Sequence, residues 1–218
     1  MTVPRYRLFV AVLAVLYSID VARSADYAAF GAQFRYLTIW ALTGNTLAAL
    51  AMLVPRWGRA DGRGDTALSV LAIIDALVVI SYWRLFLIDP SLVNGDNDPK
   101  PYREYYLHAV GPALFWIDFF WLKLGFRRML RPLLGLAIAV AAYIAWAELL
   151  VGPLNPEPVG SITSGLPYPF LNDMTPPERA RFYGITFACG AVLVPVFRGL
   201  GWVCRQLSPA RSAARPAR

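Results

Sequence analysis

The chain has 218 residues, of which 57% are hydrophobic and only 16% charged, and its formal net charge is +7. This composition leaves too little polar surface to cover a soluble globule, so a soluble domain is excluded. The basic residues stand in short clusters between apolar runs rather than along one polar face. That pattern is typical of membrane topology and argues against nucleic-acid binding.

Six apolar segments are each long enough, at about 15 to 22 residues, to cross a bilayer core as a helix. In chain order we predict spans at residues 3–22, 34–54, 67–88, 106–124, 133–151 and 182–203. The predicted fold is therefore all-α, a bundle of six transmembrane helices. It forms one domain at 1–207, followed by a basic tail at 208–218 whose composition predicts disorder.

The first segment has a second interpretation. Arg5 and Arg7 precede an apolar stretch at 8–16, and Ala22-Arg23-Ser24 follows it, so the segment could also be a cleavable signal peptide. Keeping it as a span gives an even number of helices and a consistent charge pattern. We therefore predict that it is retained.

Basic residues concentrate before the first span, after the sixth, and in alternate connections between them. They are Arg5, Arg7, Arg56, Arg59, Arg63, Lys123, Arg127, Arg128, Arg131, Arg205, Arg211, Arg215 and Arg218. By the positive-inside rule these sites, and hence both termini, are cytoplasmic. The remaining connections contain Asp26, Asp89, Asp96, Asp98, Glu157 and Asp173 and face the other side. Two of them, at 89–105 and 152–181, are long enough to form a lid over the outer mouth.

The two cysteines, Cys189 and Cys204, lie in the same last span and are about 22 Å apart along a helix. They cannot form a disulfide with each other. Neither cysteine has the spacing of a metal site, so no metal or cofactor is predicted.

Polar side chains within the predicted spans are the candidates for function, because each costs free energy in lipid unless it is paired, hydrated or used. They are Thr38, Asn45, Asp75, His108, Asp118 and Glu148. For Asp75 and Glu148 we favour interhelical hydrogen bonds that fix the packing. Asp118 lies ten residues and roughly 15 Å beyond His108 along the helix, so a direct carboxylate–imidazole bond is not expected.

Thr38 and Asn45 share one face of the second span, with Asn45 about 10 Å deeper. The Thr38 hydroxyl could simply bond to the carbonyl one turn earlier. His108 is the only histidine and could be an interfacial ring with one nitrogen in water. Since Thr38 and His108 are predicted at similar depth, they could also form a nucleophile with its general base.

Three stretches follow one another in order along the chain. They are Phe34-Arg35-Tyr36-Leu37-Thr38, then Leu107-His108-Ala109-Val110-Gly111-Pro112 with Asp118 ten residues past the histidine, then Tyr168-Pro169-Phe170-Leu171 followed by Phe182-Tyr183-Gly184. In order and approximate spacing they resemble the androgen-induced protein 1 family, which includes the androgen-dependent TFPI-regulating protein. The resemblance covers residues 34–184. The chain differs from the family in a longer connection at 153–167 and in lacking extra histidines after the acidic position.

The resemblance implies an intramembrane threonine hydrolase that cleaves esters of fatty acids with hydroxy fatty acids, without a metal. Carried over by position, Thr38 would be the nucleophile and His108 the general base. Asn45 is the nearest candidate oxyanion donor on the Thr38 face, and the role of Asp118 stays open. Tyr168 and Phe170 belong to a set of aromatic residues that form either an interfacial belt or the lining of an acyl-chain path. We predict substrate contacts at Asn45, Asp118, Tyr168 and Phe170.

A second class of function is a non-catalytic transporter or lipid-binding scaffold, in which Thr38 and His108 only line a cavity. An enzyme needs both side chains within reach of each other, a transporter needs a path that opens to both faces in turn, and a pure scaffold places them toward lipid or toward separate helices. The expected partners are the membrane and a lipid ester, not nucleic acid. The abundance of Ala and Arg is typical of a GC-rich bacterial source, which would place the protein in the inner membrane with the site toward the outer leaflet.

Overall fold

The computed structural model describes residues 2–94, 100–156 and 165–208, and within these ranges every regular element is a helix. The prediction of an all-α fold is therefore confirmed for the described chain. The predicted disordered tail lies outside the described residues from position 209 on. The same holds for 95–99 and 157–164, in the centres of the two long connections.

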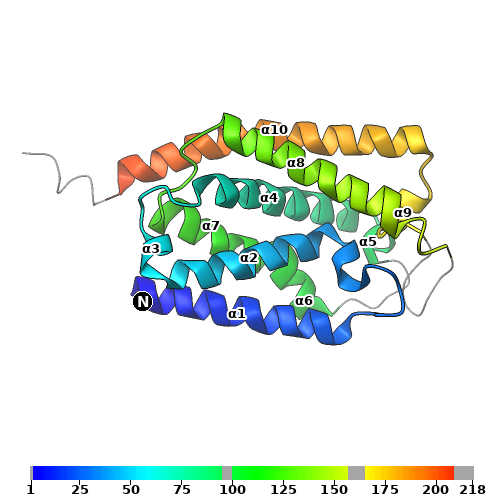
Figure 1. The fold of residues 1–218 in the computed structure, drawn as a ribbon, viewed down its shortest axis with the longest axis horizontal. Helices are drawn as coiled ribbons and strands as arrows, with labels where there is room; N and C mark the ends of the chain where they lie inside the picture. The colour runs from blue at the N-terminus through cyan, green and yellow to red at the C-terminus, as the bar shows by residue number, and fades with distance from the viewer. Residues whose placement is uncertain (1, 95–99, 157–164, 209–218) are drawn as a thin grey trace, which may run out of the picture.

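Helical segments occupy all six ranges in which the sequence predicts spans (Figure 1). The first three are α1 (Val3–Ser24), α2 (Leu37–Leu53) and α4 (Asp65–Ile88). The fourth range is built from α6 (Pro101–Tyr105), the π-helix η2 (Tyr106–Val110), α7 (Gly111–Trp116) and the π-helix η3 (Ile117–Leu122). The last two are α8 (Leu130–Trp146), continued by the π-helix η4 (Ala147–Val151), and α10 (Pro176–Leu207). Short helices lie at η1 (Ala32–Arg35), α3 (Pro55–Gly58), α5 (Ser91–Asn94) and α9 (Pro169–Asn172).

Several helix starts differ from the predicted positions, among them those of α2 and α10. The second range was expected to be helical from residue 34, but residues 32–35 form η1 and α2 begins only at Leu37. The sixth helix begins at Pro176 rather than at 182, because Thr175 and Glu178 form a capping box and proline is favoured in a first turn. The start of α2 matters for function, because it puts Thr38 in the first turn of a helix.

The long helices lie roughly along the longest axis of the molecule, which is horizontal in Figure 1, and α4 lies among the others. It packs against α2, α7, α8 and α10, while α1 packs mainly against α2. The buried core around α4 includes Ala72, Ile73, Leu77, Phe119 and Leu136. The start of α1 and the end of α10 lie at the same end of the bundle, together with α3 (Figure 1).

Three helical segments are long and apolar enough to cross a membrane, at Asp65–Ile88, Leu130–Val151 and Pro176–Leu207, and Leu37–Leu53 is apolar but shorter. Large apolar side chains also point outward on several helices, among them Leu16, Leu47, Ile138, Leu149 and Val192. Exposed apolar surface of this extent marks contact with lipid rather than water. The chain is a helical membrane protein.

The three π-helical turns each contain one of the polar residues singled out by the sequence. His108 lies in η2, Asp118 in η3 and Glu148 in η4. In η2 the amide of Gly111 bonds to the carbonyl of Tyr106, and a Cβ at position 111 would lie only 3.0 Å from that oxygen. Because π-turns are rare and are often found at functional sites, these three positions are candidates for function.

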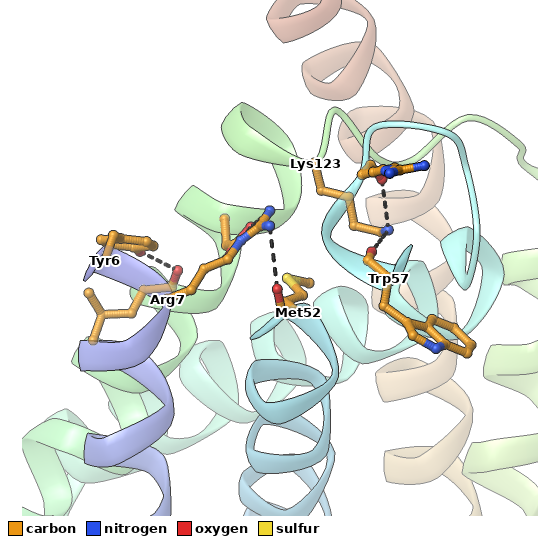
Figure 2. A network of polar contacts seen from close by, with 8 residues as sticks. Tyr6, Arg7, Met52, Trp57 and Lys123 are labelled. Carbon is orange, nitrogen blue, oxygen red and sulfur yellow. Dashed lines mark hydrogen bonds and ion pairs between the residues drawn. The ribbon is translucent and has the colours of Figure 1, made fainter. Parts of the chain in front are cut away.

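A polar network closes the end of the bundle at which α1 begins (Figure 2). Arg7 donates from Nη2 and Nε to the carboxylate of Asp118 at 2.8 and 2.9 Å, and more weakly from Nη1 to the carbonyl of Met52 at 3.4 Å. Next to it, the hydroxyl of Tyr6 donates to the carbonyl of Leu114 at 2.7 Å. The buried Arg7–Asp118 pair therefore joins α1 to the fourth helical range.

The neighbouring cation, Lys123, is also drawn inside the protein. Its ammonium group donates to the backbone carbonyls of Trp57 and Arg59, in the connection that follows α2 (Figure 2). Arg7 and Lys123 belong to the basic clusters from which the sequence predicts the membrane orientation, and both residues are buried. They contribute to the packing of the bundle as well as to the charge at this end.

We expect Arg7→Leu to destabilise the protein by about 3–5 kcal/mol, because it leaves the Asp118 carboxylate buried without a partner. Arg5→Leu is the control, since Arg5 lies two residues away and is exposed. It should change the free energy of unfolding by less than about 0.5 kcal/mol. The measurement is denaturant unfolding in detergent micelles, and equal stability of the two variants would show that the buried pair is not needed.

Candidate functional site

A cavity of about 510 Å³ lies at the opposite end of the bundle from the Arg7–Asp118 pair. Its walls come from the end of α1, the start of α2, the end of α4, the α6–η2 segment, α8 and the start of α10. Charged lining residues include Asp26, Lys100, Arg103 and Glu104, and the apolar ones include Ile74, Leu77, Val78, Ala139 and Val140. A volume of this size is typical of small-molecule sites.

Four of the six residues predicted for the site line this one cavity: Thr38, His108, Tyr168 and Phe170. Thr38 and His108 are 9% and 5% exposed, so neither side chain faces lipid. A pure scaffold, which would place them toward lipid, does not fit this arrangement, whereas an enzyme and a lipid-binding scaffold whose cavity they line both fit it. The described part of the second long connection contributes Tyr168 and Phe170 to the cavity wall.

Thr38 is the second residue of α2, and its position changes the environment of its hydroxyl. Deeper in the same helix, Thr43 and Thr46 donate to the carbonyls four residues earlier, at 2.7 and 2.8 Å. The Thr38 hydroxyl instead lies beside the phenol of Tyr168, where its hydrogen bonding favours the ionised form of the tyrosine. The sequence suggested that the Thr38 hydroxyl could bond to the carbonyl one turn earlier. In the structure a contact with Tyr168 takes its place.

Tyr168 is held in place by a backbone N–H group in the first turn of α2. The backbone N–H of Leu37, which has no acceptor within the helix, donates to the Tyr168 oxygen at 3.1 Å. Burial raises the pKa of Tyr168, and the hydrogen bonds from Thr38 and Leu37 offset part of that rise. The phenol therefore keeps its proton at neutral pH and can donate a hydrogen bond inside the cavity.

His108 is fixed by contacts to its ring and to its backbone. The imidazole stacks on the ring of Tyr82 with centroids 3.6 Å apart and planes at 3°. The indole N–H of Trp83 donates to the His108 carbonyl at 2.8 Å. On the ring itself, Nε2 lies 3.3 Å from a carboxylate oxygen of Glu104. Nδ1 is buried and has no hydrogen-bond partner among the residues that the structure describes.

Glu104 is a site residue that the sequence reasoning missed. It lies four positions before His108 and lines the same cavity. Residues separated by four positions are neighbours on a helix surface, so this spacing was the available signal. Glu104 precedes the span predicted at 106–124 and falls in a predicted connection, so hydropathy does not point to it.

Asn45 and Asp118 do not line the cavity, so their predicted substrate contacts are corrected. The Asn45 side chain points to α4, where its amide donates to Asp75 at 2.8 Å. Asp118 lies at the other end of the bundle and is bound by Arg7. Both polar groups are used for packing because an apolar bundle offers them no water.

The interhelical roles predicted for Asp75 and Glu148 are confirmed. Asp75 accepts the bond from Asn45, which joins α2 and α4. Glu148 accepts bonds from Arg179 and from the Tyr183 hydroxyl, both at 2.8 Å, which join η4 to α10.

The described residues contain no group of three or more His, Cys, Asp or Glu side chains that could hold a metal ion. Cys189 and Cys204 are both free, and Cys189 is exposed. The polar residues that line the cavity include the hydroxyl residues Thr38, Ser81 and Thr186, the imidazole of His108, several tyrosines and the charged residues named above.

The model of one protein family, described as FAR-17a/AIG1-like protein, matches residues 5–201. The chain belongs to the FAR-17a/AIG1-like family. The family resemblance inferred from residues 34–184 is confirmed, and the match extends it to α1 and to most of α10. No curated protein and no solved structure matches the chain.

We expect Ala139→Trp to weaken binding of a fluorescent fatty acid by roughly tenfold or more, about 1.4 kcal/mol. Ala139 lines the cavity, so an indole at this position fills space that an acyl chain would occupy. Ile138→Trp is the control, because Ile138 precedes it on α8 and is 71% exposed. Binding is read by fluorescence titration in detergent, and equal affinity for both variants would place the fatty acid elsewhere.

Proposed function

We propose that this FAR-17a/AIG1-like protein is an intramembrane esterase that hydrolyses fatty acid esters, with Thr38 as nucleophile and His108 as general base. The observation that carries the proposal is that both side chains line one cavity whose walls combine charged groups with apolar side chains. An ester of an acyl chain needs both kinds of surface.

In the proposed reaction, His108 removes the proton of the Thr38 hydroxyl as the oxygen attacks the ester carbonyl, because a neutral hydroxyl is a weak nucleophile. The tetrahedral intermediate collapses, the bond to the alcohol oxygen breaks, and His108 gives its proton to the departing alcohol. Water, deprotonated by the same ring, then attacks the acyl-threonine and releases the acid. In this reaction the Thr38 hydroxyl turns from Tyr168 toward the imidazole.

Tyr168 is the proposed donor to the negative oxygen of the intermediate. Its phenol lies beside Thr38, keeps its proton, and is held by the Leu37 N–H. The N-terminal end of the α2 dipole adds positive potential at the same place. Donors that are already oriented before reaction are the main source of stabilisation for such an oxyanion.

A transporter is less well supported, because it needs a path to the opposite face. The described cavity lies at one end of the bundle, and the core below it is filled by side chains such as Phe119, Phe120 and Leu136. Esters of hydroxy fatty acids, expected from the family resemblance, are the first substrates to test. A one-ended cavity supports hydrolysis of a lipid that enters and leaves on the same side.

The membrane topology belongs to the same proposal. We infer six spans with both termini in the cytoplasm and the cavity toward the outer leaflet, in the inner membrane if the source is bacterial. Support comes from the end of the bundle at which α1 begins and α10 ends. The same end contains α3 with Arg56 and the loop residue Arg59 (Figure 1). The positive-inside rule assigns such an end to the cytoplasm.

We expect Thr38→Ala and His108→Ala each to abolish hydrolysis of a p-nitrophenyl ester and of a branched fatty acid ester. Thr38→Ala should also lose labelling by a fluorophosphonate probe. Thr43→Ala is the control, because Thr43 lies on the same helix but bonds only to Ile39 and does not line the cavity. If the wild type neither hydrolyses nor labels, or if Thr38→Ala keeps full activity, the cavity serves a non-catalytic function.

Tyr168→Phe should lower kcat by about 10²- to 10³-fold, the usual effect of losing one oxyanion donor, and change KM little. The substitution removes only the hydroxyl and keeps the ring that lines the cavity. Tyr27→Phe provides the control, since Tyr27 is exposed and its hydroxyl bonds to the carbonyl of Ala22. An unchanged kcat in Tyr168→Phe, measured with the same ester, would assign the oxyanion to another donor.

A further inference from the structure

We propose that Glu104 is a positioning residue that fixes the tautomer of His108, with the proton on Nε2 and the basic lone pair on Nδ1. The proposal rests on the proposed function for the role of His108 as a base. The tautomer itself can be measured without any activity.

The first observation is the contact between the two side chains. Nε2 of His108 lies 3.3 Å from Oε2 of Glu104, and the two side chains are only 6% and 20% exposed. A carboxylate can only accept a hydrogen bond, so the imidazole nitrogen that faces it must carry a proton. The other tautomer would set two lone pairs against each other in a poorly solvated place.

The second observation is the state of the opposite nitrogen. Nδ1 is buried and finds no hydrogen-bond partner within the described part of the chain. A proton on Nδ1 would be a buried donor without an acceptor, which costs about 1–3 kcal/mol. Both nitrogens therefore favour the same neutral tautomer, in which Nδ1 is the acceptor.

The third observation is that the ring and the carboxylate are held by other contacts. Stacking on Tyr82 fixes the plane of the imidazole. Arg103, the neighbour of Glu104, is paired with Asp20 at 2.8 Å. That guanidinium is therefore engaged with Asp20, and the Glu104 carboxylate lies against His108. The orienting group thus comes from the turn just before the base, on the same helical segment.

The test uses the fact that the chain contains a single histidine. In protein labelled with ¹⁵N-histidine, every ring signal comes from His108, and the protonated and unprotonated nitrogens of a neutral imidazole have well-separated shifts. At a pH at which titration shows the ring to be neutral, we expect a proton on Nε2 and none on Nδ1. Glu104→Gln, which keeps an acceptor oxygen, should retain this pattern, and Glu104→Leu should yield a mixture of tautomers.

Kinetics provide the second readout. Glu104→Leu should lower kcat by at least about tenfold with little change in KM, because a ring in the wrong tautomer cannot accept the Thr38 proton. Glu104→Gln should recover much of that loss. Asp26→Leu is the matched control, since it also removes a carboxylate from the cavity wall but has its oxygen bound to the amide of Ala28. It should leave the tautomer unchanged.

The two proposals fail in different ways. A proton on Nδ1 in the wild type, or an unchanged spectrum in a folded Glu104→Leu variant, overturns the role of Glu104 even if the protein is an esterase. If Glu104→Leu does not fold, the spectra of the wild type and of Glu104→Gln decide the tautomer. Full activity of Thr38→Ala instead overturns the esterase and leaves the measured tautomer standing.

Discussion

In a helical bundle that faces lipid, each polar side chain must find its partner on another part of the protein, because hydrocarbon offers neither water nor acceptors. Most polar groups in this protein obey that constraint. Arg7 binds Asp118, Asn45 binds Asp75, and Glu148 is held by α10. These pairs join helices that are distant in sequence and so determine how the bundle packs.

Two polar groups that line the cavity depart from this pattern. Here Nδ1 of His108 has no partner among the described residues, and Thr38 does not make the local bond that Thr43 and Thr46 make. Leaving a buried polar atom without a partner costs free energy, and such exceptions concentrate at functional sites. The esterase proposal gives both exceptions a purpose, since a base needs a free lone pair and a nucleophile needs a hydroxyl that is not bonded to its own helix.

The π-turn of η2 connects the cavity to the rest of the fourth helical range. It inserts an extra residue just where His108 lies, after the turn that contains Glu104. The same helical segment later reaches Asp118 and the Arg7 pair at the far end of the bundle. The fourth helical range therefore carries the proposed base at one end and the buried ion pair at the other.

Hydropathy in the sequence by itself determined the helical membrane class and the six helical ranges, because about 20 apolar residues have few alternatives to a helix in lipid. Local motifs also determined the family and four of the residues that line the cavity. The sequence could not decide the partners of Asn45 and Asp118, since depth along a helix does not say which neighbour a side chain faces. Only the tertiary structure decided that Glu104, rather than Asp118, is the carboxylate beside His108. Contact between side chains depends on helix rotation and on π-turns, which hydrophobic periodicity does not encode.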